Sequence, residues 1–316
     1  MNKKTMVVIG ALLAVTIGAF GFSKFSGTES NAEAEVLETV VVKHDSGETE
    51  VNKNPQRVGV FDYGIWDSLD KLGIEGIIGV VKDNLPEHLS KFKADEYTSV
   101  GTLKEPNMEK IFELKPDLII ISGRQAEYYD ELSKIAPTVG LSVDNENYLE
   151  SFKVNMATVG EIFDKEEAVE KELAEITDAI DALNKKVTEK KANGLIALAN
   201  DGSFSVYGAE SRFGIIHNNF GVTPVEESIE ASTHGQKASF EYIVEKNPQY
   251  LFVVDRAAIA GGTTSAKDLF NNELMEKTDA FKNDNIVYLN PSIWYTATGG
   301  FTSTMMMVEE INEAIK

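Results

Sequence analysis

The stretch MEKIFELKPDLIIISGR, residues Met108–Arg124, is matched in pattern by FEYIVEKNPQYLFVVDR, residues Phe240–Arg256. In both copies a helical segment leads to a proline and then to an apolar strand, which is typical of α/β proteins. The offset is 132 residues throughout, so that Glu109 matches Glu241 and the final arginines match each other. Because helix, proline, strand and arginine agree in one register, we predict two homologous α/β lobes.

A long helical stretch separates the two copies. Between residues 150 and 191 the chain contains no proline, and apolar residues such as Ile176, Ile180, Leu183 and Val187 recur at helical spacing. We therefore predict an N-terminal lobe over 35–160, a single bridging helix over 161–192 and a C-terminal lobe over 193–316. Each lobe is expected to contain a central, mostly parallel sheet.

The N-terminus has the pattern of a secretory signal. Lys3 and Lys4 precede an almost wholly apolar run from Met6 to Phe22. This run is short for a membrane anchor, since a bilayer span needs about 20 apolar residues. We predict that residues 1–34 are a signal peptide and leader and that the protein is exported. A permanent anchor is the alternative.

Charge and composition exclude several functions. The formal net charge of −21 opposes binding to nucleic acid and to anionic lipid. The absence of cysteine rules out thiolate catalysis and cysteine-bound zinc. The chain has no HExxH, GxSxG or GxGxxG motif, and the glycine-rich segment 261–268 departs from a phosphate-binding loop at Ala266 and Asp268. An enzyme is therefore the least favoured class.

Three arginines occupy positions suited to ligand binding. Arg124 and Arg256 follow strands, and Arg212 lies in a turn before a predicted helix. Ligands of open α/β sheets bind beyond the carboxyl ends of the strands, and the arginine guanidinium suits oxyanions and aromatic faces. The repeat therefore predicts an anionic ligand in a cleft between the lobes. Ordinary surface ion pairs are the alternative for each arginine taken singly.

Two loop residues are candidate iron ligands. His234 and Tyr295 each lie in a loop flanked by small or polar residues, and loops on a rigid scaffold often carry binding residues. An imidazole and a phenolate together suit ferric iron. Packing and hydrogen bonding remain the alternative explanation for both.

From about residue 36 to its end, the chain resembles the siderophore-binding proteins of ABC iron importers. The likeness is strongest to the branch that binds catecholate siderophores of the petrobactin type. The segments that carry it are Asn107–Glu109, Pro116–Leu118, Ser211–Gly214, Thr233–Gln236, Val254–Arg256 and Ile293–Tyr295.

The resemblance implies a fold and a ligand site. The fold is the class III periplasmic-binding fold, in which one long helix bridges two α/β lobes. The resemblance assigns Arg124, Arg212 and Arg256 to a ferric catecholate, and it implies that His234 and Tyr295 bind iron directly when the siderophore supplies only four donors. Iron would arrive as part of the ligand, and no permanently bound cofactor is implied.

The resemblance also implies a partner and a location. Glu109 and Glu241 would dock the two lobes onto an ABC permease in the inner membrane. The protein is expected to be a periplasmic monomer, or alternatively to be tethered to the outer face of the cytoplasmic membrane. Tyr63 and Trp294 are candidate aromatic lining of the cleft, although core packing explains them equally well. Haem, a hydroxamate siderophore and cobalamin remain alternative ligands.

Overall fold

The computed structural model describes residues 38–229, 231–232 and 234–316. The predicted signal peptide and leader, residues 1–34, lies outside the described residues. Among the described helices, none is both long enough and apolar enough to cross a membrane.

The first sheet is fully parallel and has the strand order β5-β4-β3-β6-β7. Strand β6, which lies inside the sheet between β3 and β7, has the sequence LIII and is buried along its length, as expected for a parallel strand covered on both faces. We call this sheet and its helices the N-terminal lobe. Its elements are β3 (Val58–Val60), α1 (Tyr63–Lys71), β4 (Ile77–Val80), η1 (Glu87–Lys93), β5 (Thr98–Ser99), α2 (Met108–Leu114), β6 (Leu118–Ile121), η2 (Gly123–Tyr128), α3 (Tyr129–Leu132) and β7 (Thr138–Gly140).

A separate antiparallel hairpin precedes this sheet. Its strands β1 (Thr39–His44) and β2 (Gly47–Asn52) pair with each other in register from Thr39 opposite Asn52 to His44 opposite Gly47.

The second sheet is mixed, with three parallel and two antiparallel strand pairings among the described residues. Strand β8 pairs in parallel with β10 and β12 but antiparallel with β9, and β11 adds antiparallel to β9. We call this sheet and its helices the C-terminal lobe. Its elements are β8 (Asn193–Asn200), β9 (Ser203–Tyr207), α6 (Ile215–Asn218), β10 (Thr223–Pro224), β11 (Gln236–Lys237), α7 (Phe240–Lys246), β12 (Tyr250–Asp255), α8 (Ala257–Ala260), α9 (Ala266–Leu269), η3 (Met275–Lys277), α10 (Asp279–Lys282) and β13 (Ile286–Leu289).

The two copies of the repeat have the same local structure. Helices α2 and α7 begin at side-chain caps, Asn107 and Ser239, and each ends at a left-handed residue, Lys115 with φ 47° and Asn247 with φ 40°. A proline then leads into β6 or β12. Because the proline cannot continue the helix, both copies turn back into the sheet at the same point.

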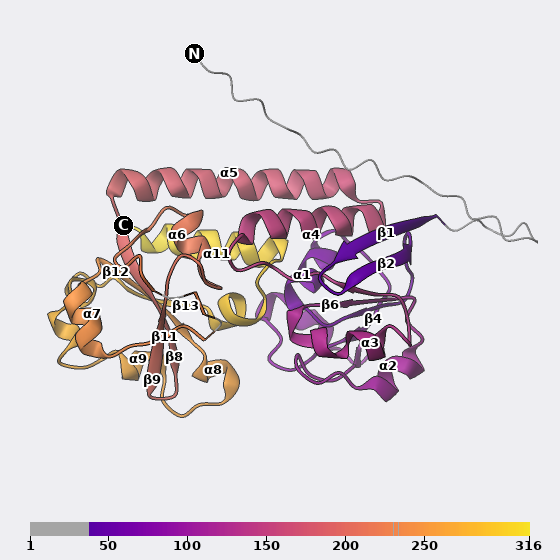
Figure 1. Cartoon of the computed structure of the whole chain (residues 1–316), viewed down its shortest axis with the longest axis horizontal. Coiled ribbons are helices and arrows are strands. Elements are labelled where there is room, and N and C mark those ends of the chain that lie inside the picture. Colours follow the sequence, from indigo (N-terminus) through magenta and orange to yellow (C-terminus); the bar gives the residue numbers. More distant parts are fainter. Residues whose placement is uncertain (1–37, 230, 233) are drawn as a thin grey trace, which may run out of the picture. The chain divides into compact units, whose positions relative to one another are not determined.

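Two helices lie between β7 and β8 along the chain, and the first of them packs against β1 in the N-terminal half. They are α4 (Tyr148–Phe163) and α5 (Glu166–Lys190), and they are separated by left-handed Asp164 with φ 49°. Figure 1 shows α5 running along both lobes, with α4 and α11 (Phe301–Ala314) packed beside it. Although α11 ends the chain, it also packs against α1 of the N-terminal lobe. The predicted lobe boundaries at 160 and 192 stay a prediction.

Candidate functional site

Three arginines lie where strands of the two sheets end. Arg124 is in η2 directly after β6, and Arg256 follows β12 at the start of α8. Arg212 lies between β9 and α6. All three residues are partly buried, and they are contributed by both lobes.

The three guanidinium groups converge on Tyr295. Nη2 of Arg124 and Nη2 of Arg212 donate to the Tyr295 carbonyl oxygen at 2.7 and 2.9 Å. Nε of Arg256 donates to the Tyr295 hydroxyl at 3.0 Å, and its Nη1 donates to Asn200 Oδ1 at 2.6 Å. The Arg212 guanidinium carbon lies 4.3 Å from the centre of the Tyr295 ring, within the range of a cation–π contact. The structure therefore brings these four predicted residues together.

This setting changes the acidity of Tyr295. Burial raises the pKa of the phenol, but the hydrogen bond from Arg256 and the charges of Arg212, Arg256 and Arg124 outweigh that effect. The pKa of Tyr295 is lowered from its usual 10.0 as a result. A phenol that ionises more readily is a better ligand for a hard cation such as ferric iron.

Two buried polar atoms beside Tyr295 lack partners. Within the described residues, neither Nε of Arg212 nor the hydroxyl of Tyr207 has a hydrogen-bond partner. Burial, followed by the nearby charge of Arg124, lowers the pKa of Arg212. Since buried polar atoms are nearly always paired in folded proteins, these two atoms mark a place for ligand or solvent atoms. Tyr207 was missed from the sequence, although it ends a strand just before the segment that contains Arg212.

A carboxylate on α11 holds the turn that carries Tyr295. This turn is the π-helical segment η4 (Ser292–Thr296). Glu310 accepts from Trp294 Nε1 at 2.6 Å through one oxygen and from the Asn290 backbone N–H at 2.8 Å through the other. Burial raises the pKa of Glu310. The sequence did not indicate this contact.

The segment after Tyr295 is bound to the N-terminal lobe. Asp67 of α1 accepts from the Ser303 backbone N–H at 2.7 Å, at the first turn of α11. The Tyr148 hydroxyl of α4 accepts from the Gly299 N–H at 2.8 Å. The segment that follows Tyr295 is thus hydrogen-bonded to α1 and α4, while Arg212 and Arg256 of the C-terminal lobe bond Tyr295 itself.

His234 lies in a loop beside Tyr207, since a Cβ atom at the following residue, Gly235, would lie 2.7 Å from the Tyr207 ring. It is exposed and stands two residues before β11. Its backbone N–H donates to Ser232 Oγ at 3.3 Å. No hydrogen bond between the described residues joins its ring to Tyr295.

Tyr63 and Trp294 are both fully buried. The Tyr63 hydroxyl donates to the Asp83 carbonyl oxygen, and burial raises the pKa of its phenol. Trp294 packs within the core and bonds Glu310. Their burial agrees with core packing, so a role in lining the cleft stays a prediction for both.

Glu109 and Glu241 lie at equivalent exposed positions. Each is in the first turn of its helix, α2 or α7. A hydrogen bond with its own backbone N–H and one from Ser239 lower the pKa of Glu241. Both carboxylates are thus available at the surface.

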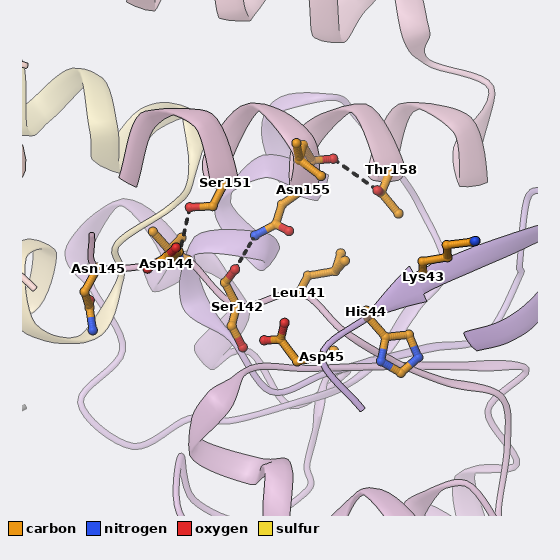
Figure 2. Close-up of a pocket in the computed structure, with 13 residues that line it drawn as sticks. Lys43, His44, Asp45, Leu141, Ser142, Asp144, Asn145, Ser151, Asn155 and Thr158 are labelled. Atoms are coloured by element: carbon orange, nitrogen blue, oxygen red, sulfur yellow. Dashed lines mark hydrogen bonds between the residues drawn. The ribbon is translucent and has the colours of Figure 1, made fainter. Parts of the chain in front are cut away.

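A separate hollow lies in the N-terminal lobe, between the β1–β2 hairpin, α4 and the segment after β7 (Figure 2). Its polar groups largely bond one another. Asn155 donates to the Ser142 carbonyl oxygen at 2.9 Å, and Ser151 Oγ accepts from the Asp144 N–H at 2.9 Å. The hollow contains none of the arginines and not Tyr295, so we do not assign the ligand to it.

Comparison of this sequence and structure with known proteins identifies its family. The family described as periplasmic binding protein matches residues 58–293. The chain belongs to this family. Its relatives are solute-binding proteins rather than enzymes, and its fold is the class III periplasmic-binding fold that the sequence resemblance implied.

The relatives include siderophore-binding proteins. The petrobactin-binding protein YclQ of Bacillus subtilis is 46% identical over the full length of both chains. Its crystal structure matches with a TM-score of 0.87 and 48% identity, covering 88% of this chain and 99% of that chain. The ferric-anguibactin-binding protein FatB of Vibrio anguillarum is 36% identical, over 95% of this chain and 96% of FatB. The periplasmic catecholate-siderophore-binding protein VctP of Vibrio cholerae matches with a TM-score of 0.83 and 36% identity, covering 87% of this chain and 100% of VctP.

Proposed function

We propose that this protein captures a ferric catecholate siderophore and delivers it to an ABC importer. The observation that carries the proposal is the convergence of Arg124, Arg212 and Arg256 on Tyr295. These are three of only four arginines in the chain, and they come from both lobes. The names of the relatives YclQ, FatB and VctP support the same class of ligand.

The chemistry of the ligand fits the cluster. A ferric catecholate complex is anionic, and three guanidiniums can neutralise it against the negative charge of the whole chain. Arginine can also stack on catechol rings. The unpartnered Arg212 Nε and Tyr207 hydroxyl supply further donors for catecholate oxygens. Haem, hydroxamate siderophores and cobalamin are the competing ligands, and neutral hydroxamates make the poorest use of three positive charges.

A parallel titration tests the ligand class. We expect quenching of the intrinsic fluorescence by a ferric catecholate at lower concentration than by a ferric hydroxamate, haem or cobalamin. The Arg256→Ala variant should bind the ferric catecholate at least tenfold more weakly, about 1.4 kcal/mol, because it loses the cation that bonds the Tyr295 hydroxyl. Equal affinity for all four ligands, or unchanged affinity in the variant, would contradict the proposal.

We further propose that Tyr295 and His234 complete the coordination of iron when the siderophore has only four donors. The lowered pKa of Tyr295 favours the tyrosinate that such a bond requires. In the structure His234 is exposed, and no hydrogen bond among the described residues joins its ring to Tyr295.

Absorption spectroscopy tests this ligation. Adding a tetradentate ferric catecholate is expected to shift its ligand-to-metal charge-transfer band. The Tyr295→Phe variant should lose most of the shift, and acidification should reverse it, because protonation removes the tyrosinate. A hexadentate ferric catecholate serves as the control and should give no shift. An identical shift in wild type and Tyr295→Phe would remove Tyr295 from the coordination sphere.

The two exposed glutamates support a role in delivery. We propose that Glu109 and Glu241 each contact a cation of the ABC permease, one per lobe. The protein would act as a monomer outside the cytoplasmic membrane, in the periplasm or tethered to the outer face of that membrane. Residues 1–34 would direct its export.

A further inference from the structure

Among the described residues, Arg256 forms hydrogen bonds only with neutral groups. Its Nε donates to the Tyr295 hydroxyl at 3.0 Å and its Nη1 donates to Asn200 Oδ1 at 2.6 Å. Across residues 38–229, 231–232 and 234–316, no ion pair involves Arg256. The chain has 51 acidic and 30 basic side chains, so carboxylates are plentiful. The neutral surroundings of this arginine therefore need an explanation.

Asp255 directly precedes Arg256, but its carboxylate bonds elsewhere. Its Oδ1 accepts from the Ala258 backbone N–H at 3.2 Å, and its Oδ2 accepts from the Ala266 backbone N–H at 2.8 Å. These two N–H groups belong to the short helices α8 and α9. The nearest carboxylate along the chain is thus occupied by backbone donors and forms no ion pair with the guanidinium.

Asp201 directly follows Asn200, and its carboxylate also bonds elsewhere. Its Oδ1 accepts from the backbone N–H groups of Thr264 at 2.9 Å and Thr263 at 2.8 Å. These hydrogen bonds lower the pKa of Asp201, so it is charged at neutral pH. The turn after β8 therefore places the neutral amide of Asn200 against Arg256 and directs the neighbouring negative charge to another loop.

An amide and a carboxylate in this place would have different effects. Both offer an oxygen that accepts a hydrogen bond from arginine, but only the carboxylate carries a charge. A carboxylate in contact with Arg256 would neutralise it and weaken its attraction for an anion. The amide fixes one edge of the guanidinium while Tyr295 fixes another. The remaining N–H donors of Arg256 have no partner within the described residues.

We propose that Asn200 is a positioning residue of the ligand site, which orients Arg256 beside Tyr295 without neutralising its charge. This rests on the proposed capture of an anionic ferric catecholate and adds a residue that acts on the ligand through Arg256. Asn200 is exposed at the end of β8. Because substitutions at exposed positions usually change stability little, its variants should fold and unfold like the wild type in a thermal melt.

The Asn200→Asp variant tests whether the neutral amide is required. It keeps the shape and the acceptor oxygen but adds a negative charge, so ferric catecholate should bind about tenfold more weakly in a fluorescence-quenching titration. Asn193→Asp is the matched control. Asn193 begins the same strand, and its Oδ1 accepts from the Gln249 N–H at 2.9 Å. It adds the same charge at the opposite end of β8 and should bind like the wild type.

Ionisation of Tyr295 gives a second measurement, which needs no ligand. Burial raises the pKa of Tyr295, while the hydrogen bond from Arg256 and the charges of the three arginines lower it. Neutralising Arg256 should therefore move the ionisation midpoint of Tyr295 to higher pH in Asn200→Asp but not in Asn193→Asp. Carbon-13 NMR of labelled tyrosine measures the midpoint, and Tyr295→Phe assigns the signal.

The Asn200→Ala variant separates orientation from charge. It removes the acceptor without adding a charge and should weaken ferric catecholate binding about threefold, as for the loss of one hydrogen bond. Wild-type affinity in Asn200→Ala would overturn the positioning role. A wild-type Tyr295 midpoint in Asn200→Asp, or equal losses of affinity in Asn200→Asp and Asn193→Asp, would overturn the role of the neutral amide. A wild type that fails to bind ferric catecholate would count against the proposed function, and the Tyr295 midpoint would still decide the role of Asn200.

Discussion

The Arg212→Met variant is expected to lose about a hundredfold in affinity for a ferric catecholate, ~2.8 kcal/mol, while the ligand-free protein loses no stability. Methionine keeps much of the side-chain volume but carries no charge. Arg212 is held in a setting that lowers its pKa through burial and the charge of Arg124, and its Nε has no partner among the described residues. A buried charge without a counter-ion costs desolvation free energy, so removing it offsets the loss of the Arg212 contacts with Tyr295. The ligand, in contrast, loses a cation placed for it.

Two measurements check this expectation. Thermal unfolding of the ligand-free variant reports its stability, and fluorescence quenching reports its affinity. Arg57→Met is the matched control, because Arg57 lies before β3 and bonds the Lys115 carbonyl oxygen at 3.0 Å, away from Tyr295. It should keep ligand affinity and lose some stability. If Arg212→Met unfolded at a much lower temperature and still bound normally, Arg212 would be a structural residue.

The opposite responses expected at Arg57 and Arg212 would distinguish a fold-stabilising cation from a ligand-binding one. A binding site that holds unpartnered donors in the ligand-free state gives up stability for function. The cluster around Tyr295 fits this principle. Three guanidinium groups contact one neutral side chain, and their positive charges are not neutralised until the phenol ionises or an anionic ligand binds.

The repeat was predictable because its signals are local. Cap, helix, proline and strand follow one another within 17 residues in each copy, and the structure has them at Met108–Ile121 and Phe240–Asp255. The placement of Arg124 and Arg256 after strands follows from the same short pattern. Parallel pairing of β6 and β12 with their neighbours then places both arginines at the carboxyl ends of the sheets.

Contacts between distant residues were not predictable. Asp67 bonds Ser303 across 236 residues of sequence, and no periodicity connects a buried helix residue to a later loop. For the same reason the return of α11 to the N-terminal lobe was missed. The antiparallel pairing of β9 with β8 was also not predicted, although Asp201 and Gly202 between the two strands are typical of a tight hairpin turn.

Aromatic residues were the least informative. Tyr63, Trp294 and Tyr207 are all buried, and an aromatic side chain packs equally well in a core or around a ligand. Of these three, Tyr207 alone has a buried polar atom without a partner among the described residues, and that property is visible in three dimensions alone. The structure therefore adds Tyr207 to the site that the arginines defined.

The Gly64→Ala variant is expected to lower the free energy of unfolding by about 3 kcal/mol, which is typical of a forced collision in a packed core. A Cβ atom at Gly64 would lie 2.1 Å from the Thr298 carbonyl oxygen. Because the colliding atom belongs to the backbone, α1 and the segment after Tyr295 must move apart. The variant should therefore also bind ferric catecholate more weakly.

We would compare Gly64→Ala with Gly59→Ala by measuring the stability of each in urea and its affinity for ferric catecholate. Gly59 is in β3, also buried, and a Cβ atom there would meet nothing closer than Ile119 at 3.9 Å. Gly59→Ala should keep both stability and affinity. If Gly64→Ala is destabilised but binds ferric catecholate with wild-type affinity, the bond between α1 and the Tyr295 segment supports the fold without positioning the ligand. If both fall together, the N-terminal lobe holds Tyr295 in place for the arginines of the C-terminal lobe.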